Sequence, residues 1–283
     1  MQMNITIIKP GIQSSLQDFG KWGEQAFGVS IGGVMDPIAA KIANIICKNN
    51  EEAPVLEMTL HGTEILFNQD ASIAITGSGS IPYINNIKIP FNKLIQVPRF
   101  SVLKTKPSAV GCRSYLAMTD ATSESIQEIE ISTWQINYAE NFSHEKIIHC
   151  IPGPEWNWFD ETSQKNFFSH QFTVSNQSNR MGYRLEGMQL KTKEKKELLS
   201  TAVTKGVIQV THEGLPIVLM SDAQTTGGYP RIGRIAGADL STLAQCRPSD
   251  KISFKEISEE DSINRWKDQQ LMLKKIKNSI GLT

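Results

Sequence analysis

Polar residues and glycines follow directly on an apolar run in the last third of the chain. The run is LPIVLM at 215–220, and the segment QTTGGYP follows it at 224–230. Glutamine and threonine side chains make hydrogen bonds, and glycine lets a ligand approach the backbone closely. The same residue types are typical of a surface turn, which local residue chemistry alone favours. At this point a turn and a binding loop are both open interpretations.

A second segment whose residue types suit binding or catalysis is NRMGYRLEG at 179–187, which alternates polar and apolar residues. If it is extended, Arg180, Arg184 and Glu186 share one face of a strand. One interpretation is an arginine paired with Glu186 on an exposed strand, where an ion pair contributes little. The other is that Arg180 presents its planar guanidinium to a carboxylate or a phosphate. The segment by itself favours neither interpretation.

A glycine-rich stretch begins directly after Gln17 and Asp18. Five glycines lie between positions 20 and 33, and each loses much backbone freedom on folding, which a plain connection does not require. We therefore expect a pocket that uses Gln17 and Asp18. Asp36, just beyond this stretch, has a simpler role as the cap of a helix that begins at the next residue.

Composition and spacing exclude several functional classes. Lys plus Arg number 29 and Asp plus Glu number 29, so the net charge is zero, and neither a nucleic acid nor a membrane is a predicted partner. The spacing of His144, His149 and Cys150 fits no zinc pattern, so no metal site is predicted. The segment TGSGS at 76–80 lacks the lysine of a P-loop, and IPYI rather than a helix follows it.

The cellular compartment can also be inferred. The four cysteines contain no C-x-x-C pair, which indicates a reducing compartment rather than a disulfide framework. The N-terminal residues MQMNITIIKPG lack the basic and apolar regions of a signal peptide. We expect a cytoplasmic protein.

Short apolar or alternating runs dominate the chain and predict a mainly β fold with a few short helices. The expected strands are 4–9, 55–59, 63–67, 71–76, 94–97, 101–104, 113–118, 147–151, 171–175, 206–210, 215–220 and 251–254. Helices are expected after Asp36, within 239–246 and over 258–278, where Ser258 can cap the last one. A break at Pro152 predicts two domains, 1–146 and 147–283.

The order of several motifs resembles one protein family. They are QDFGKWG at 17–23, GVSIGGVMDPIAAKIAN at 28–44, LEMTLHG at 56–62, SNRMGYRLEG at 178–187 and QTTGGYPRIG at 224–233. The chain is similar to the KipA-like family, also called allophanate hydrolase subunit 2 or biotin-dependent carboxyltransferase-related proteins, whose 5-oxoprolinase members are named PxpC. The resemblance implies two cyclophilin-like β-barrel halves, and it makes QTTGGYP a pocket loop.

The activity that the resemblance implies is ATP-dependent opening of 5-oxo-L-proline to L-glutamate by a complex of subunits. Catalytic roles fall to Asp18, Arg180 and Asp222. The expected substrate-binding residues are Gln17, Gln209, Gln224, Thr225, Thr226, Gly227, Gly228 and Tyr229. ATP with Mg²⁺ is expected to be shared with a partner, and biotin is not attached to this chain because it lacks a Met-Lys-Met site. The implied partners are a KipI-like (PxpB) subunit and a PxpA-type subunit.

Two alternatives and two departures from the family accompany this expectation. The chain is alternatively a carboxyltransferase component that acts on a urea-like amide, or a non-catalytic antagonist of a KipI-like kinase inhibitor. Lys21 stands where the family usually has arginine, and residues 119–142 lack the family's Gly-Gly and Gly-Ser-Arg-Ser-Thr motifs. We expect 119–142 to form an ordinary strand-and-turn connection, because its apolar residues alternate.

Overall fold

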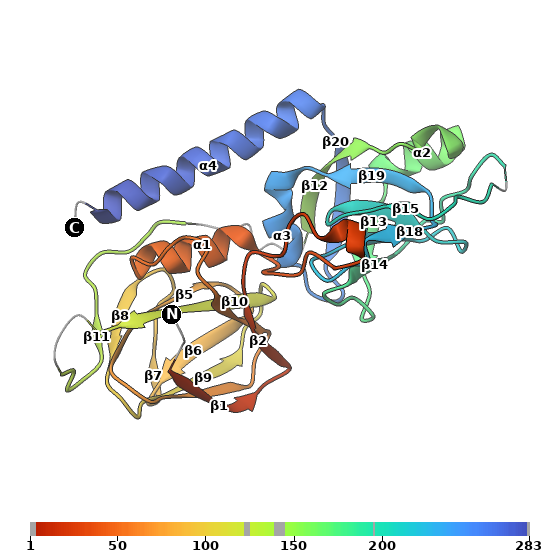
Figure 1. Cartoon of the computed structure of the whole chain (residues 1–283). Helices are drawn as coiled ribbons and strands as arrows, with labels where there is room; N and C mark the ends of the chain where they lie inside the picture. Colours follow the sequence, from red (N-terminus) through yellow and green to blue (C-terminus); the bar gives the residue numbers. More distant parts are fainter. Residues whose placement is uncertain (1–3, 122–124, 139–144, 195, 282–283) are drawn as a thin grey trace. The chain divides into compact units, whose positions relative to one another are not determined.

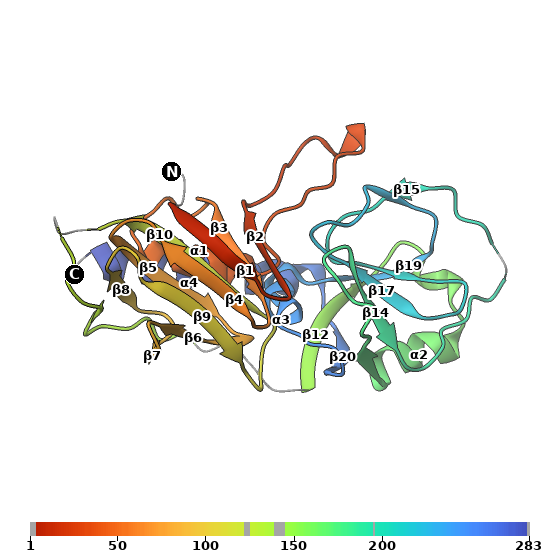
Figure 2. The ribbon, with the colours of Figure 1, turned by 90° about the horizontal axis from the view of Figure 1, so that it is seen from below.

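The structure is a computed structural model that describes residues 4–121, 125–138, 145–194 and 196–281. Its contacts divide the chain into two compact units. Unit 1 contains Met1–Phe19, Asp36–Phe142 and Gln270–Thr283, and unit 2 contains Gly20–Met35 and Ser143–Gln269. Most of the regular elements in both units are strands (Figures 1 and 2). The predicted mainly β fold is confirmed.

Unit 1 is built from two antiparallel sheets. Its strands are β1 (Ile5–Pro10), β2 (Gln13–Gln17), β3 (Val55–Thr59), β4 (Thr63–Phe67), β5 (Ala71–Gly77), β6 (Ser80–Ile84), β7 (Ile87–Lys88), β8 (Leu94–Val97), β9 (Val102–Pro107), β10 (Arg113–Asp120) and β11 (Glu130–Ile131). The five-stranded sheet has the order β1-β4-β9-β6-β7, and the six-stranded sheet has the order β11-β8-β5-β10-β3-β2. Apolar residues of both sheets form one buried cluster.

Helix α1 (Pro37–Ile46) packs on β5 and β10 of the six-stranded sheet. Asp36 caps it as predicted, because its Oδ1 accepts the Ala39 N–H at 3.0 Å. Ile38, Ile42 and Ile46 recur at helical spacing and are buried, so this face anchors the helix. The hydroxyl of Thr76, in β5, donates to the carbonyl of Ala39 at 2.6 Å and joins the helix to the sheet.

Unit 2 contains a closed barrel in the order β12-β19-β16-β17-β14-β13-β20. The bounds are β12 (Glu145–Pro152), β13 (Gln171–Val174), β14 (Gly182–Glu186), β16 (Val207–Val210), β17 (Pro216–Leu219), β19 (Arg231–Ile235) and β20 (Lys251–Glu256). A two-stranded sheet of β15 (Thr201–Ala202) and β18 (Thr226–Gly227) lies outside the barrel order. Closure leaves no unpaired edge among the barrel strands.

Several helices complete the chain. They are α2 (Glu161–Ser169), α3 (Leu240–Ala244), α4 (Glu259–Gly281) and the short 3-10 helices η1 (Gln25–Phe27), η2 (Trp156–Trp158) and η3 (Gly237–Asp239). Helix α4 begins as predicted, since the Ser258 hydroxyl accepts the Asp261 N–H at 3.0 Å. None of the helices in the described ranges combines the length and apolar character needed to cross a membrane.

The segment 119–142 contains less strand than its alternation predicts. Strand β10 ends at Asp120, and beyond it only the two-residue strand β11 forms among the described residues of the segment, paired with β8. Residues 122–124 and 139–142 lie outside the described residues. The predicted domain limits at 146 stay a prediction. The contact-based units differ from them, because Gly20–Met35 belongs to unit 2 and Gln270–Thr283 to unit 1.

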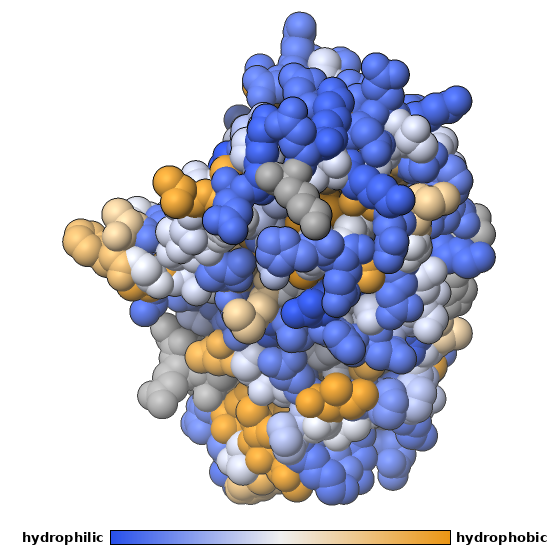
Figure 3. Space-filling view, turned by 90° about the vertical axis from the view of Figure 1, so that its right-hand side faces the viewer, coloured by the Kyte–Doolittle hydropathy of each residue, from blue (hydrophilic) through white to orange (hydrophobic). Residues whose placement is uncertain are grey.

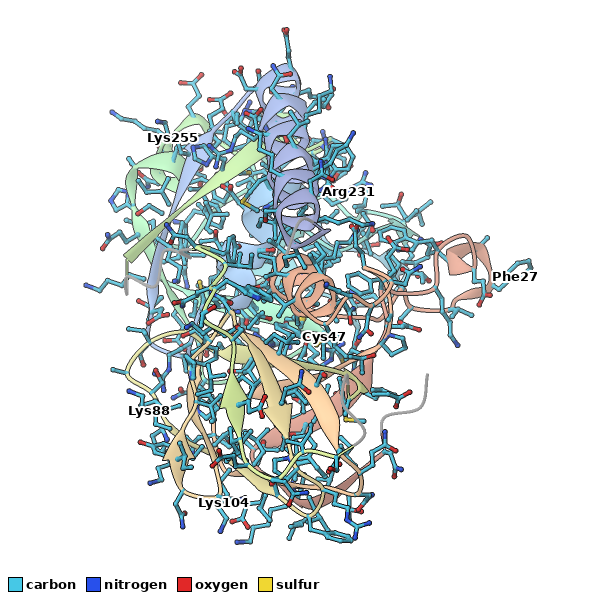
Figure 4. All side chains as sticks on the ribbon, turned by 90° about the vertical axis from the view of Figure 1, so that its left-hand side faces the viewer. Phe27, Cys47, Lys88, Lys104, Arg231 and Lys255 are labelled. Atoms are coloured by element: carbon cyan, nitrogen blue, oxygen red, sulfur yellow. The ribbon has the colours of Figure 1, made fainter. Side chains whose placement is uncertain are left out.

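Both units contain buried cysteine thiols that are not joined in disulfides. Cys47 and Cys112 belong to unit 1, and Cys150 and Cys246 to unit 2. Cys47, labelled in Figure 4, directly follows α1. Burial raises the pKa of the Cys150 thiol to about 12 and the pKa of the Cys47 thiol still further. These thiols are therefore packing groups rather than nucleophiles.

Candidate functional site

The glycine-rich segment 28–35 and the turn that precedes QTTGGYP meet in unit 2. The N–H of Gly32 donates to the carbonyl of Ser221 at 2.8 Å. The hydroxyl of Ser221 donates back to the carbonyl of Val34 at 3.1 Å. Two motifs that are almost 190 residues apart in the sequence are thereby joined through reciprocal hydrogen bonds.

Arg180 holds together the junction between segment 28–35 and the turn at Ser221 with its guanidinium. Its Nε and Nη2 donate to Oδ2 and Oδ1 of Asp222 at 2.7 and 2.9 Å. Nη2 also donates to the carbonyl of Gly33 at 2.6 Å. The Arg180 side chain is 6% exposed and that of Asp222 is 40% exposed. This bidentate pair is stronger and more directional than a single-point ion pair, and only its carboxylate faces solvent.

The arrangement around Arg180 differs from both interpretations of the 179–187 segment. Arg180 pairs with Asp222 rather than with Glu186, whose Oε1 accepts the Ser175 hydroxyl at 2.6 Å. Its guanidinium is buried, so it does not stand open to a ligand within unit 2. The geometry places Arg180 as a group that positions the loop 28–35.

Lys205 is a further cation at this junction, and sequence analysis missed it. Its Nζ donates to the carbonyls of Val34 and Met35 at 3.0 Å each and to the hydroxyl of Ser221 at 2.9 Å. An ammonium has three donor hydrogens, and these acceptors match that number. The only signal in the sequence is a Lys-Gly pair before a buried strand, which is common in turns.

Gln209, in β16, supports the QTTGGYP loop. It is 1% exposed, and its Nε2 donates to the carbonyl of Tyr229 at 3.2 Å. A Cβ added at Gly227 would lie only 2.5 Å from this nitrogen. A side chain at position 227 would therefore force the Gln209 amide to shift. The exposed neighbours Gln224 and Thr226 carry the polar groups that face solvent.

The end of the loop is fastened by an ion pair that sequence analysis also missed. Arg231, labelled in Figure 4, donates through Nε and Nη2 to Glu155 at 2.7 and 2.6 Å, and its backbone N–H donates to the same carboxylate at 3.0 Å. Burial alone would raise the pKa of Glu155, but these hydrogen bonds outweigh burial and hold the pKa below its usual value. Hydrogen bonding to Glu155 raises the pKa of Arg231.

Two cavities border the loop. Beside Gln224, Thr225 and Lys205 the free space is only about 10 Å³, room for one water molecule. On the side of Gly228 and Pro230 a cavity of about 880 Å³ opens. Its other lining residues include Lys191, Lys196, His212 and Glu213. The second cavity has the size of ordinary small-molecule sites.

The structure thus brings most of the predicted residues together. Arg180, Gln209, Asp222 and residues 224–229 all lie in unit 2 around the loop. Gln17 and Asp18 belong to unit 1, where Gln17 ends β2 and donates to Ser15 at 2.9 Å, and Asp18 is exposed. The catalytic and binding roles assigned to these residues stay predictions.

No cluster of metal ligands is found in the parts of the chain that the structure describes. His144, considered in the sequence, lies outside the described residues. His149 is instead paired with Asp239, since its Nδ1 lies 2.7 Å from Oδ2 of that residue. Arg265 donates to the other oxygen of Asp239 at 2.8 Å. This trio joins the start of α4 to η3, and it reaches no cavity described above.

Comparison with known families decides the classification. The model of the carboxyltransferase domain, subdomain A and B, matches residues 27–125 and 121–256. The chain belongs to this family. The resemblance inferred from the motifs is therefore confirmed.

Two relatives extend the match over nearly the whole chain. The C subunit of the 5-oxoprolinase of Escherichia coli is 34% identical, over 94% of this chain and 95% of that protein. The C subunit of the 5-oxoprolinase of Haemophilus influenzae is 30% identical, over 98% of both.

A solved structure supports the fold. The K. lactis urea amidolyase matches 97% of this carboxyltransferase-family chain with a TM-score of 0.85 at 23% identity, and the match covers 20% of that larger chain. At this level of identity the likeness shows the fold alone.

Proposed function

We propose that this chain is a subunit of an ATP-dependent 5-oxoprolinase that opens 5-oxo-L-proline to L-glutamate. One observation carries the proposal, namely the alignment with two relatives named as C subunits of 5-oxoprolinase at 34% and 30% identity over almost their entire lengths. Because both chains are covered almost end to end, the match is to whole subunits rather than to one shared domain. The word subunit in their names supports action within a complex.

The reaction needs activation of a stable amide. Resonance makes the lactam carbon a poor electrophile for water near neutral pH. Transfer of the γ-phosphoryl group of ATP to the lactam oxygen makes the ring carbon electrophilic. Water then adds to that carbon and the ring C–N bond breaks, which leaves a free amine and an acyl phosphate. A second water molecule hydrolyses the acyl phosphate to the carboxylate of glutamate and inorganic phosphate. Such a sequence needs hydrogen-bond donors and cations placed around developing negative charge.

In this proposal the cationic residues of this chain hold the substrate-binding loop in place rather than contact the reacting atoms. Arg180 and Lys205 hold the backbone of 33–35 and the turn at Ser221 in one geometry. That turn leads directly into Gln224 and Thr225, whose amide and hydroxyl groups are available to orient a substrate. A rigid supporting layer of this kind keeps substrate-contacting groups within the narrow limits that catalysis requires.

The described residues do not by themselves fit Mg²⁺ and ATP. Both oxygens of Asp222 already accept hydrogen bonds from Arg180, and the described part of the chain forms no group of metal ligands. The hydroxyl and N–H of Ser78, in the glycine segment 76–80, donate to backbone carbonyls. We therefore assign the nucleotide to a site that partner subunits complete, a KipI-like (PxpB) subunit with a PxpA-type subunit beside it.

Reconstitution tests the proposal. The isolated chain is expected to release no glutamate from 5-oxo-L-proline with ATP, whereas the chain combined with PxpB-type and PxpA-type subunits releases it. The measurement is ATP-dependent glutamate formation by each combination of purified subunits. A full complex without turnover would overturn the proposal, and strong turnover by the isolated chain would overturn the need for partners.

A carboxyltransferase that acts on a urea-like amide is the second candidate, and the family match itself favours it. The two reactions differ in their co-substrates. Carboxyl transfer consumes bicarbonate and needs a biotin carrier, which is regenerated in each turnover, whereas lactam opening uses neither. Incorporation of labelled bicarbonate into urea by the complex, with no glutamate formed from 5-oxo-L-proline, would favour the second candidate.

A further inference from the structure

Unit 1 contains a cavity that the proposed function does not use. Its volume is about 310 Å³, within the range of small-molecule sites. Its walls come from the glycine segment at 77–80, the strand and turn residues 81–82 and 88–92, the turn at 108–110, and Tyr138. All of these residues belong to unit 1.

The glycine segment at this cavity does not offer a phosphate site. The N–H of Ser78 donates to the carbonyl of Arg113 at 2.7 Å, so it is not free to hold an anion. The hydroxyls of Ser78 and Ser108 both donate to the carbonyl of Val110, at 3.0 and 3.1 Å. With its hydrogen engaged, the Ser78 hydroxyl offers oxygen lone pairs to the cavity, whereas the Ser108 hydroxyl already accepts the Val110 N–H at 3.3 Å. A ligand that brings hydrogen-bond donors therefore suits this wall.

Asn92 adds an acceptor that lacks a partner. Its Nδ2 donates to the carbonyl of Tyr138 at 3.3 Å, which fixes the amide orientation because the reverse would set two oxygens against each other. Its Oδ1 is buried and has no hydrogen-bond partner among the described residues. A buried acceptor without a donor is unfavourable, and an N–H that enters the cavity beside Asn92 removes that penalty.

The remaining walls define the rest of the ligand. Ile81, Pro82, Ile89, Pro90, Phe91 and Val110 supply an apolar surface. Lys88 also lines the cavity, and its side chain is exposed at the surface of unit 1 (Figure 4). A compact ring would pack on the apolar wall, and an anionic group would lie at the Lys88 side.

We propose that this cavity binds a small ring compound that carries an amide N–H and a carboxylate. The N–H donates to Asn92 Oδ1, the ring packs on Phe91 and Ile89, and the carboxylate faces Lys88. The proposal concerns binding by this chain alone and does not depend on the oxoprolinase reaction. 5-Oxo-L-proline carries all three features and serves as the probe.

Matched ligands test the chemistry. Calorimetric titration of the full chain with 5-oxo-L-proline is compared with its lactone analogue, 5-oxotetrahydrofuran-2-carboxylate, in which an oxygen replaces the N–H. We expect the lactone to bind about tenfold more weakly or worse, because it leaves the acceptor unpaired. Equal binding of the two compounds, or no binding of 5-oxo-L-proline at millimolar concentration, would overturn the proposal.

Matched variants test whether the ligand binds in this cavity. Asn92 has a φ of 60° and Asn86 a φ of 68°, so glycine is tolerated at both. Asn92→Gly is expected to lose about tenfold in affinity for 5-oxo-L-proline. Lys88→Gln should lose about two- to fivefold, with the loss shrinking in high salt.

Asn86→Gly is the control, because Asn86 is exposed and lies outside this cavity. It should bind as wild type does. Unchanged affinity in Asn92→Gly, or an equal loss in both glycine variants, would overturn the proposal. Binding with the expected pattern supports the site whether or not the reconstituted complex releases glutamate, so the two proposals fail separately.

Discussion

Arg180 is the residue on which the geometry of the loop junction depends most. Its guanidinium donates to both oxygens of Asp222 and to the carbonyl of Gly33. We expect Arg180→Lys to impair the complex almost as badly as Arg180→Ala, by about a hundredfold in rate, because an ammonium cannot make the paired contacts. Both variants should also lose about 2 kcal/mol of unfolding free energy, since the contacts are buried.

The measurements are glutamate release by the complex and urea unfolding of the chain. Arg184→Lys is the matched control, since Arg184 is exposed in the same segment. A double-mutant cycle with Asp222→Asn gives the coupling energy of the pair. Wild-type rates and stability in both Arg180 variants would contradict the positioning role.

Glu155 gives a pH-dependent prediction. Its pKa in the folded chain lies below the usual value, which is about 4.3 in the unfolded chain. On acidification the unfolded chain therefore binds this proton before the folded chain does. The stability from the Glu155–Arg231 pair is complete above the unfolded pKa and is lost as pH falls through the lowered folded pKa.

Urea unfolding of wild type and Glu155→Gln at several pH values checks the direction in which this stability changes with pH. The wild type should be more stable near neutral pH, and the difference should shrink below about pH 4. Glu213→Gln is the control, because Glu213 is exposed. A stability difference that is constant across this pH range would rule out the linkage.

Some site residues were predictable from the sequence and others were not. Arg180 and Asp222 stand in segments whose polar residues interrupt apolar runs, which is a visible signal. Lys205 and Glu155 stand among ordinary turn residues, and only the tertiary contacts to Val34 and Arg231 distinguish them. No local pattern encodes a partner that lies 171 residues away along the chain.

At the scale of elements, the QTTGGYP loop depends on how closely it approaches strand β16. Gly227→Ala would bring a Cβ within 2.5 Å of the Gln209 amide, whereas the added Cβ at Gly228 would lie 3.2 Å from the nearest atom, the Leu198 carbonyl. We expect Gly227→Ala to cost about 1–3 kcal/mol of unfolding free energy through overpacking.

A second substitution tests whether the clash with Gln209 causes this loss of stability. In a Gln209→Ala background the clash is gone, so Gly227→Ala should cost much less there. Thermal unfolding of the two single variants and the double variant provides the comparison. A full additive loss in the double variant would show that Gly227 is needed for some other reason.

Strands with clear apolar alternation were predictable. The expected strands 55–59, 63–67 and 94–97 match β3, β4 and β8 residue for residue. Strand β19 (Arg231–Ile235) and helix α2 (Glu161–Ser169) were missed. Two arginines and a glycine interrupt β19, and α2 buries only Ser163 and Phe167, so neither has a strong periodic signal.

At the scale of the whole molecule, the exposed aromatic residues of segment 20–35 are candidate contacts for the partner subunit proposed above. Trp22 is 67% exposed and Phe27 is 85% exposed. Figure 4 shows Phe27 at the tip of this segment, and Figure 3 shows a surface that is mainly hydrophilic with separate apolar patches. Exposed tryptophan and phenylalanine are typical anchors of protein interfaces.

We expect alanine at Trp22 and Phe27 to weaken binding to the KipI-like subunit by about 30-fold or more, as loss of an anchor does. Sedimentation of the purified subunits measures the effect. Phe100→Ala is the control, because Phe100 is 63% exposed but lies in unit 1. Equal assembly by all three variants would place the interface elsewhere.

The placement of segment 20–35 was not predictable from the sequence. Composition and strand spacing suggested two halves in simple succession, divided near residue 146. The contacts assign Gly20–Met35 to unit 2 through hydrogen bonds to Ser221, Arg180 and Lys205. Such contacts depend on polar groups that are far apart in the sequence, and hydrophobic periodicity carries no information about them.

The four buried thiols give the molecule an internal reporter of unfolding. Two are in each unit, and a buried thiol reacts with an alkylating reagent only after exposure. Pulsed alkylation across a urea gradient, with each cysteine followed by mass, therefore times the opening of the two units separately. One common midpoint would mean that the units unfold as a single cooperative body, and two midpoints would show which unit opens first.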